Sequence, residues 1–215
     1  MQVHQGHAPR GVYVITPDWS DTARLCKTVE QALRGGAGAV QLRNKTASAA
    51  LRRELALALA PIVRAAGRPF FVDNDLELAI DAGADGLHIG RDDGDPAEVR
   101  AKLPSAMMLG VSCYADLQRV QVAMKAEAAY VALGAIAASK TKVGAALAPL
   151  ERITEARRLG AHVAASGGID RDNIARVAAA GALAVGVVSA IFDAQDPQRA
   201  TAELVARFAM GATGT

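Results

Sequence analysis

The chain has 215 residues, is 51% hydrophobic and only 4% aromatic, and carries a formal net charge of +2. This length suits one sizeable core built from Ala, Val, Leu and Ile, which is typical of α/β proteins with buried parallel strands. The slight charge, with no basic stripe interleaved with aromatic residues, argues against nucleic acid or an acidic membrane as a partner.

Two further features bear on the compartment. Cys26 and Cys113 are too few for a disulfide framework or a thiolate metal site, and both are expected to be buried and reduced. The N-terminal segment 1–10 is polar, and no apolar run reaches the length that spans a membrane. These features predict a cytoplasmic protein.

Short apolar runs alternate with helical patterns along the whole chain. The runs predicted as strands are 11–16, 39–43, 69–73, 86–89, 107–112, 129–133, 162–165 and 184–188. Between them, apolar residues recur at helical spacing. The longest such stretch is 49–66, in which one buried stripe is predicted for Leu51, Leu55, Leu59, Ile62 and Val63.

Eight strand–helix units without a break in composition predict a single (β/α)8 TIM barrel of the α/β class. The domain is expected to cover 1–215, with tails at 1–10 and 210–215. An open doubly wound sheet is the alternative, but the first strand is followed by Thr-Pro-Asp-Trp rather than by Gly-x-Gly-x-x-Gly. In a barrel, chemistry is expected at the carboxyl ends of the strands.

Three polar side chains end the second predicted strand. In extended backbone, alternate side chains share a face, so Gln41, Arg43 and Lys45 project the same way. Arg offers a planar fork of donors and Lys a mobile point charge, a combination that suits an anion with many oxygens. A solvated strand end is the alternative interpretation.

Acidic clusters follow the next two strands. Asp73, Asn74 and Asp75 follow the third strand, and Asp92 and Asp93 follow the fourth. Their oxygens can converge on Mg²⁺, which is usually held by a few carboxylates together with substrate phosphate oxygens. The alternative is that Asp75 and one of the later pair cap the helices that follow.

The loop after the sixth strand, 134–148, carries hydroxyl and ammonium groups but no acid. Ser139, Thr141 and Lys142 suit the capture of a phosphate, and the length and small residues of the loop indicate a lid. A flexible solvated loop is the alternative.

Other residues at the predicted mouth have less specific interpretations. Gly168 and the pair Val188 and Ser189 follow the seventh and eighth strands, where barrels usually seat a phosphate. His88 is a site residue or a packed core imidazole, and Ser112 is a ligand contact or a helix cap.

These residues form two anion-binding sets, one suited to a metal-bound pyrophosphate and one to a single phosphate. Two phosphorylated small molecules bound side by side indicate group transfer. No Ser/His/Asp or Cys/His set is apparent, which argues against hydrolysis through a covalent intermediate. Small phosphorylated substrates are therefore the expected partners, with a homo-oligomer left open.

The most specific segments together resemble a known family. Residues 41–45 read Gln-Leu-Arg-Asn-Lys, 84–93 read Ala-Asp-Gly-Leu-His-Ile-Gly-Arg-Asp-Asp, and 139–142 read Ser-Lys-Thr-Lys. With the rest of the chain from Tyr13 to Ile191, they resemble thiamine-phosphate synthases. The resemblance implies a barrel enzyme that joins hydroxymethylpyrimidine pyrophosphate to a thiazole phosphate and releases pyrophosphate, with Mg²⁺ as its cofactor.

The resemblance also implies roles for individual residues. The pyrimidine pyrophosphate would be held by Gln41, Arg43, Lys45, Ser112 and Lys142, of which the last four are the catalytic candidates. Asp73, Asn74 and His88 complete the substrate site. The thiazole phosphate would be seated by Ser139, Thr141, Gly168, Val188 and Ser189. The metal would be bound by Asp93 with the acidic triplet, in which Asn74 or Asp75 takes the place of the usual aspartate.

Two departures from the family pattern keep other functions in view. Asp73-Asn74 inverts the usual Asn-Asp order, and Ala138-Ser139 stands where the family has Pro and Thr. A related thiazole tautomerase shares the barrel but needs a general base, and this chain has no histidine near Tyr114. A barrel that binds a thiazole phosphate without catalysis is the third hypothesis.

Overall fold

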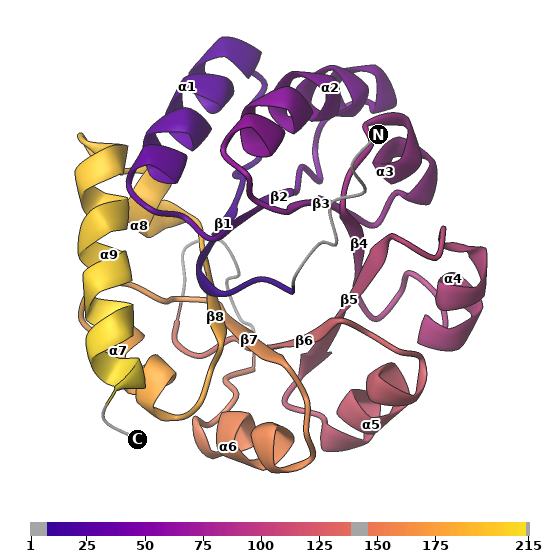
Figure 1. Cartoon of the computed structure of the whole chain (residues 1–215), viewed down its shortest axis with the longest axis vertical. Coiled ribbons are helices and arrows are strands. Elements are labelled where there is room, and N and C mark those ends of the chain that lie inside the picture. The colour runs from indigo at the N-terminus through magenta and orange to yellow at the C-terminus, as the bar shows by residue number, and fades with distance from the viewer. Residues whose placement is uncertain (1–7, 139–145, 214–215) are drawn as a thin grey trace.

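Eight parallel strands form one closed barrel in the computed structural model, which describes residues 8–138 and 146–213 (Figure 1). The strands are β1 Gly11–Ile15, β2 Ala39–Leu42, β3 Phe70–Asp73, β4 Gly86–Ile89, β5 Met108–Tyr114, β6 Tyr130–Leu133, β7 Val163–Ser166 and β8 Ala184–Val187. Each strand pairs with the next in sequence, and β8 pairs with β1. The predicted (β/α)8 barrel is confirmed, and the open sheet is excluded.

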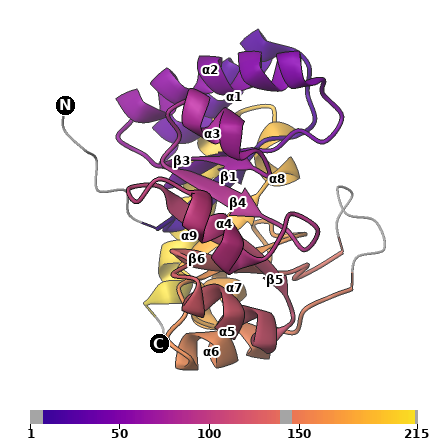
Figure 2. The same ribbon diagram turned by 90° about the vertical axis from the view of Figure 1, so that its right-hand side faces the viewer.

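The helices surround the barrel. They are α1 Thr22–Arg34, α2 Ala49–Ala65, α3 Leu76–Asp81, α4 Pro96–Lys102, α5 Leu117–Lys125, α6 Glu151–Arg158, α7 Ile174–Ala179, α8 Ser189–Phe192 and α9 Pro197–Ala212. Seen from the side, α2 and α3 cover one wall, and α5 and α6 cover the opposite wall (Figure 2). Within the described residues, none of these helices combines the length and the apolar character that a membrane crossing requires.

The apolar stripes that predicted the helices do pack against the barrel, although less completely than expected. In α2, Leu55, Leu59 and Val63 are fully buried, whereas Leu51 and Ile62 are only partly buried. Branched aliphatic residues and alanines from strands and helices fill this outer core. Burial of such surface is the main source of stability in a fold of this kind.

A second, smaller core fills the inside of the barrel. Tyr13, Phe71 and Tyr130 project inward from β1, β3 and β6, with ring centroids 5.3 to 5.9 Å apart in edge-to-face contacts. Gly86 and Gly110 make room for two of these rings, because a Cβ at either glycine would lie within 2.5 Å of ring atoms. The aromatic layer fills the barrel beneath the carboxyl ends of the strands.

Three predicted helix or chain ends are wrong. Helix α4 is capped by Asp95, which accepts from Ala97 N, and neither Asp92 nor Asp93 caps it. Helix α5 is capped by Asp116 rather than by Ser112. The tail expected from residue 210 is helical as far as Ala212, because α9 continues along α7 and α1 (Figure 1).

The cysteines are free thiols, as expected, but only one is fully enclosed. Cys113 is buried in β5, and burial raises the pKa of its thiol to about 12. Cys26 on α1 is partly buried, so the expectation that both are buried is wrong for this residue. Burial and the nearby Glu30 carboxylate also raise the pKa of the Cys26 thiol, so both side chains are protonated at neutral pH.

Candidate active site

One cavity opens at the carboxyl ends of the strands and gathers most of the predicted site residues. It is lined by Gln41, Arg43, Lys45, Asp73, Asn74, His88, Asp93, Ser112, Gly168, Val188 and Ser189. These residues come from six different strand ends, and nothing but the barrel geometry brings them together. The mouth is therefore the candidate active site, as expected for this fold.

Four predicted residues are not among this set. Asp75 does not line the cavity: its Oδ1 accepts from Leu78 N at the start of α3, and its Oδ2 lies 3.9 Å from Arg52 Nη2. The capping interpretation of Asp75 is thus confirmed. Ser139, Thr141 and Lys142 lie outside the described residues, so their predicted roles stay predictions.

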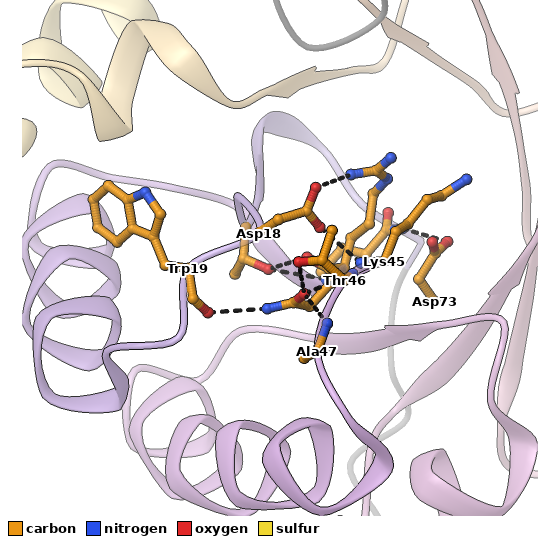
Figure 3. Close-up of polar contacts among 10 residues, drawn as sticks. Asp18, Trp19, Lys45, Thr46, Ala47 and Asp73 are labelled. Atoms are coloured by element: carbon orange, nitrogen blue, oxygen red, sulfur yellow. Dashed lines mark hydrogen bonds and ion pairs between the residues drawn. The ribbon is translucent and has the colours of Figure 1, made fainter.

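The predicted row of donors lies along one side of the cavity. Strand β2 ends at Leu42, one residue earlier than predicted, yet Gln41, Arg43 and Lys45 all line the cavity. Gln41 is buried, and its Nε2 donates to Asp73 Oδ1 at 2.9 Å (Figure 3). Arg43 is 16% exposed and Lys45 is exposed, so a charged ligand in the cavity can reach both cations.

Asn44 explains why these alternate residues keep the same direction beyond the end of β2. It is buried, is not among the residues that line the cavity, and donates through Nδ2 to the carbonyl of Trp19 at 2.9 Å (Figure 3). Its Oδ1 accepts from the backbone N–H groups of Thr46 and Ala47. These two bonds form a turn of the kind that Asn side chains stabilise. The loop itself therefore holds the donor row, which consists of Gln41, Arg43 and Lys45, in place.

Three aspartates and one asparagine of the mouth lie at the end of β3 or after β3 and β4. Asp73, Asn74, Asp92 and Asp93 line the cavity, and Asp93 Oδ2 accepts from Gly90 N at 2.6 Å. Within residues 8–138 and 146–213, no three acidic, histidine or cysteine side chains are grouped closely enough to hold a metal unaided. Mg²⁺ commonly uses only one or two carboxylates and takes its other ligands from substrate phosphate and water, so this donor set suits it.

Gly168, Val188 and Ser189, which follow β7 and β8, also line the cavity. Gly168 has a φ of +67°, and a Cβ there would lie 2.4 Å from the carbonyl oxygen of Ala137. Only glycine fits this backbone. Its carbonyl accepts from Asn173 Nδ2 at 2.8 Å. That these residues seat a single phosphate stays a prediction.

A chain of buried hydrogen bonds runs beneath the mouth. His88 Nε2 lies 2.8 Å from Ser112 Oγ, and His88 Nδ1 lies 2.8 Å from Tyr130 Oη, which lies 2.9 Å from Tyr13 Oη. Burial raises the pKa of both tyrosines, so they remain neutral phenols at physiological pH. The interpretation of His88 as a packed, hydrogen-bonded core imidazole is therefore confirmed. His88 also lines the cavity, and its contact with substrate stays a prediction.

Sequence reasoning missed several residues that line the cavity. Tyr13 projects inward from β1, and Arg91 and Tyr114 stand at the rim, where the guanidinium lies 4.6 Å from the ring centroid. Arg119 of α5 donates to the carbonyls of Ser112 and Gly90 and so joins the ends of β5 and β4. Alternate side chains of a strand face the same side, and the place of Tyr13 in this alternation was the one local indication available.

Comparison with known proteins identifies the family. Residues 12–191 match the family described as thiamine monophosphate synthase. A thiamine-phosphate synthase of Bordetella bronchiseptica is 48% identical over 209 residues, which cover 94% of this chain and 96% of that protein. A thiamine-phosphate synthase of Aromatoleum aromaticum is 48% identical over 189 residues, covering 87% and 91% of the two chains.

Solved structures agree. A thiamine phosphate pyrophosphorylase from Pyrococcus furiosus superposes with a TM-score of 0.82 at 29% identity, covering 94% of this chain and 96% of that one. A 3-hexulose-6-phosphate synthase, at 20% identity and a TM-score of 0.71, covers 91% and 98% of the two chains and shares only the fold. With the donor row and the acidic residues at one barrel mouth, these matches show that the chain belongs to the thiamine monophosphate synthase family.

Proposed function

We propose that this enzyme joins hydroxymethylpyrimidine pyrophosphate to a thiazole phosphate, giving thiamine phosphate and pyrophosphate. The observation that supports this best is that one cavity is lined both by the donors that end β2 and by residues that follow β7 and β8. Gln41, Arg43 and Lys45 suit a pyrophosphate, and the pocket at Gly168 and Ser189 suits a single phosphate. An enzyme that acts on one phosphorylated substrate alone would need only one of these regions.

The proposed reaction exchanges a C–O bond for a C–N bond. The bond between the pyrimidine methylene carbon and pyrophosphate breaks, and its electron pair leaves with the pyrophosphate. The thiazole nitrogen then supplies the pair for the new bond to that carbon. Arg43 and Lys45 would stabilise the charge that grows on the leaving group, which is the usual way a preorganised site lowers such a barrier.

Mg²⁺ is part of this proposal. Asp93 would hold it together with Asp73 or Asn74, since these residues line the cavity and Asp75 is engaged as the cap of α3. When bound, the metal would neutralise part of the pyrophosphate charge. Lys142, Ser139 and Thr141 keep the roles that the family resemblance implies. A cytoplasmic location, where free thiols stay reduced, accords with this function.

A direct assay tests the proposal. The full chain, both substrates and Mg²⁺ should yield thiamine phosphate and pyrophosphate in equal amounts, and omission of either substrate should abolish both. Arg43→Ala should lower kcat/KM by at least ~100-fold, because a charge-assisted contact to the leaving group is lost. Arg53→Ala is the matched control, since Arg53 is exposed on α2 and pairs with Asp81. Absence of product from the folded chain would falsify the proposed function.

A further inference from the structure

The segment that follows β1 holds the end of β2 after the ladder between these strands has ended. The last pair in register is Ile15 and Gln41. Beyond it, the buried Thr16 hydroxyl accepts from Arg43 N and donates to Arg43 O, both at 2.9 Å. The Thr16 side chain therefore takes the place of one further pair of backbone hydrogen bonds between β1 and β2, and it fixes the backbone of Arg43.

Asp18 contacts both cations of the row. Its Oδ1 accepts from the backbone N–H of Lys45 at 2.7 Å, and its Oδ2 lies 3.8 Å from Arg43 Nη1 (Figure 3). The side chain of Asp18 is 34% exposed, and it does not line the cavity. One carboxylate from the β1–α1 segment thus contacts the backbone of one cation and the guanidinium of the other.

These contacts have two electrostatic consequences of opposite sign for an anion in the cavity. Asp18 adds a negative charge near the place where pyrophosphate would bind, and Coulomb repulsion alone would weaken binding. Its hydrogen bond to Lys45 N and its contact with Arg43 restrict the two cations before the ligand arrives, which reduces the ordering cost of binding. The observed contacts of Asp18 are with the donor row itself, so the second effect should dominate.

We infer that Asp18 is a positioning residue for pyrophosphate binding: it holds Arg43 and Lys45 on the cavity side of the β2–α2 loop. The inference rests on the proposed function, because it assumes that the row binds pyrophosphate. It adds a residue outside the cavity to the binding machinery and predicts that removing the Asp18 acceptor weakens the binding of an anion, even though a negative charge is removed with it.

Three substitutions separate positioning from charge. Asp18→Ala removes the acceptor and the charge together, and Asp18→Asn keeps an oxygen acceptor at the same place but removes the charge. Asp18→Glu keeps the charge and moves the carboxylate by one methylene group. Titration calorimetry with inorganic pyrophosphate and Mg²⁺ should show ~tenfold weaker binding for Ala and several-fold weaker binding for Glu, with Asn at least as tight as the wild type.

Kinetics give a second readout, with Asp81→Ala as the control, because Asp81 is an exposed carboxylate paired with an arginine away from the cavity. In Asp18→Ala, KM for the pyrimidine pyrophosphate should rise, whereas KM for the thiazole phosphate should stay unchanged. A general loss of structure would affect both. Circular dichroism checks that each variant is folded, and if Ala does not fold, Glu carries the test.

The outcomes distinguish the two proposals. If the wild type does not bind Mg²⁺ and pyrophosphate, the proposed function fails. If the wild type binds and a folded Asp18→Ala binds as tightly or more tightly, Asp18 acts only through repulsion and the inference is overturned. Wild-type affinity in Asp18→Glu would overturn it as well, since the acceptor has moved but the charge has not.

Discussion

Asp73 and Asp75 are two residues apart, yet their carboxylates lie in different places. Asp73 faces the cavity and accepts from Gln41, whereas Asp75 caps α3 and lies near Arg52. Asn74 stands between them with a φ of 62° and donates through its backbone N to the carbonyl of His88. Left-handed backbone is tolerated by Asn better than by most residues, and this turn separates the two acids.

At this scale we predict that Asp93→Ala raises the Mg²⁺ concentration for half-maximal activity by at least ~tenfold, because a carboxylate at the cavity is lost. Asp75→Ala should leave that concentration unchanged and instead cost about 1 kcal/mol of stability through loss of the cap. Mg²⁺ titrations of activity and urea unfolding curves measure the two effects. An equal shift in Mg²⁺ requirement for both variants would contradict this assignment.

At the scale of elements, neighbouring strands fit together through a glycine and an aromatic ring. A Cβ at Gly110 of β5 would lie 2.3 Å from Tyr130 Cζ of β6. The ring has no room to retreat, because it packs against Tyr13 and Phe71. Helix and strand propensities alone would favour alanine over glycine, but here the close contact with the ring makes alanine destabilising.

We therefore predict that Gly110→Ala destabilises the protein by about 1–3 kcal/mol, the usual cost of overpacking. Combining it with Tyr130→Leu should recover part of this cost, because the smaller side chain makes room for the added methyl group. Urea unfolding of the wild type, both single variants and the double variant gives the coupling. Strictly additive effects would show that the ring and the glycine do not constrain each other.

The distance in sequence between contacting residues explains which features could be predicted from the sequence. Buried parallel strands such as Ala184–Val187 are continuous apolar runs, so their position is a local property, and barrel topology then places their ends at one mouth. The alternative of Ser112 as a helix cap was wrong, since its hydroxyl instead contacts His88, 24 residues away in sequence. Asp18 was missed because its contact with Lys45 crosses 27 residues and its contact with Arg43 is also distant in sequence. Such long-range contacts leave no periodic pattern.

At the scale of the whole molecule, buried tyrosines make stability depend on alkaline pH. Burial raises the pKa of Tyr130, and burial with the neighbouring phenol raises that of Tyr13. In the unfolded chain a tyrosine ionises near pH ~10. Above that pH the unfolded state binds fewer protons than the folded state, so stability must fall as pH rises.

We predict that Tyr130→Phe reduces this alkaline loss. At pH 8 the variant should be less stable by about 1–3 kcal/mol, because His88 Nδ1 and the hydroxyl of Tyr13 each lose a partner. Between pH 9 and 11 its stability should decline more slowly than that of the wild type, by up to ~1.4 kcal/mol per pH unit for the missing titration. Urea unfolding across this range provides the measurement, and parallel declines would refute the prediction.

The aromatic layer inside the barrel also has an evolutionary consequence. Tyr13, Phe71 and Tyr130 support the strands from within, while most side chains suited to phosphorylated ligands lie above them at the ends of separate strands. Mouth residues such as Lys45, which make no contact with this layer, can be substituted without disturbing it, whereas His88 is hydrogen-bonded to Tyr130. A lineage with this scaffold can therefore change the ligands that the mouth accepts without first rebuilding the core of the barrel.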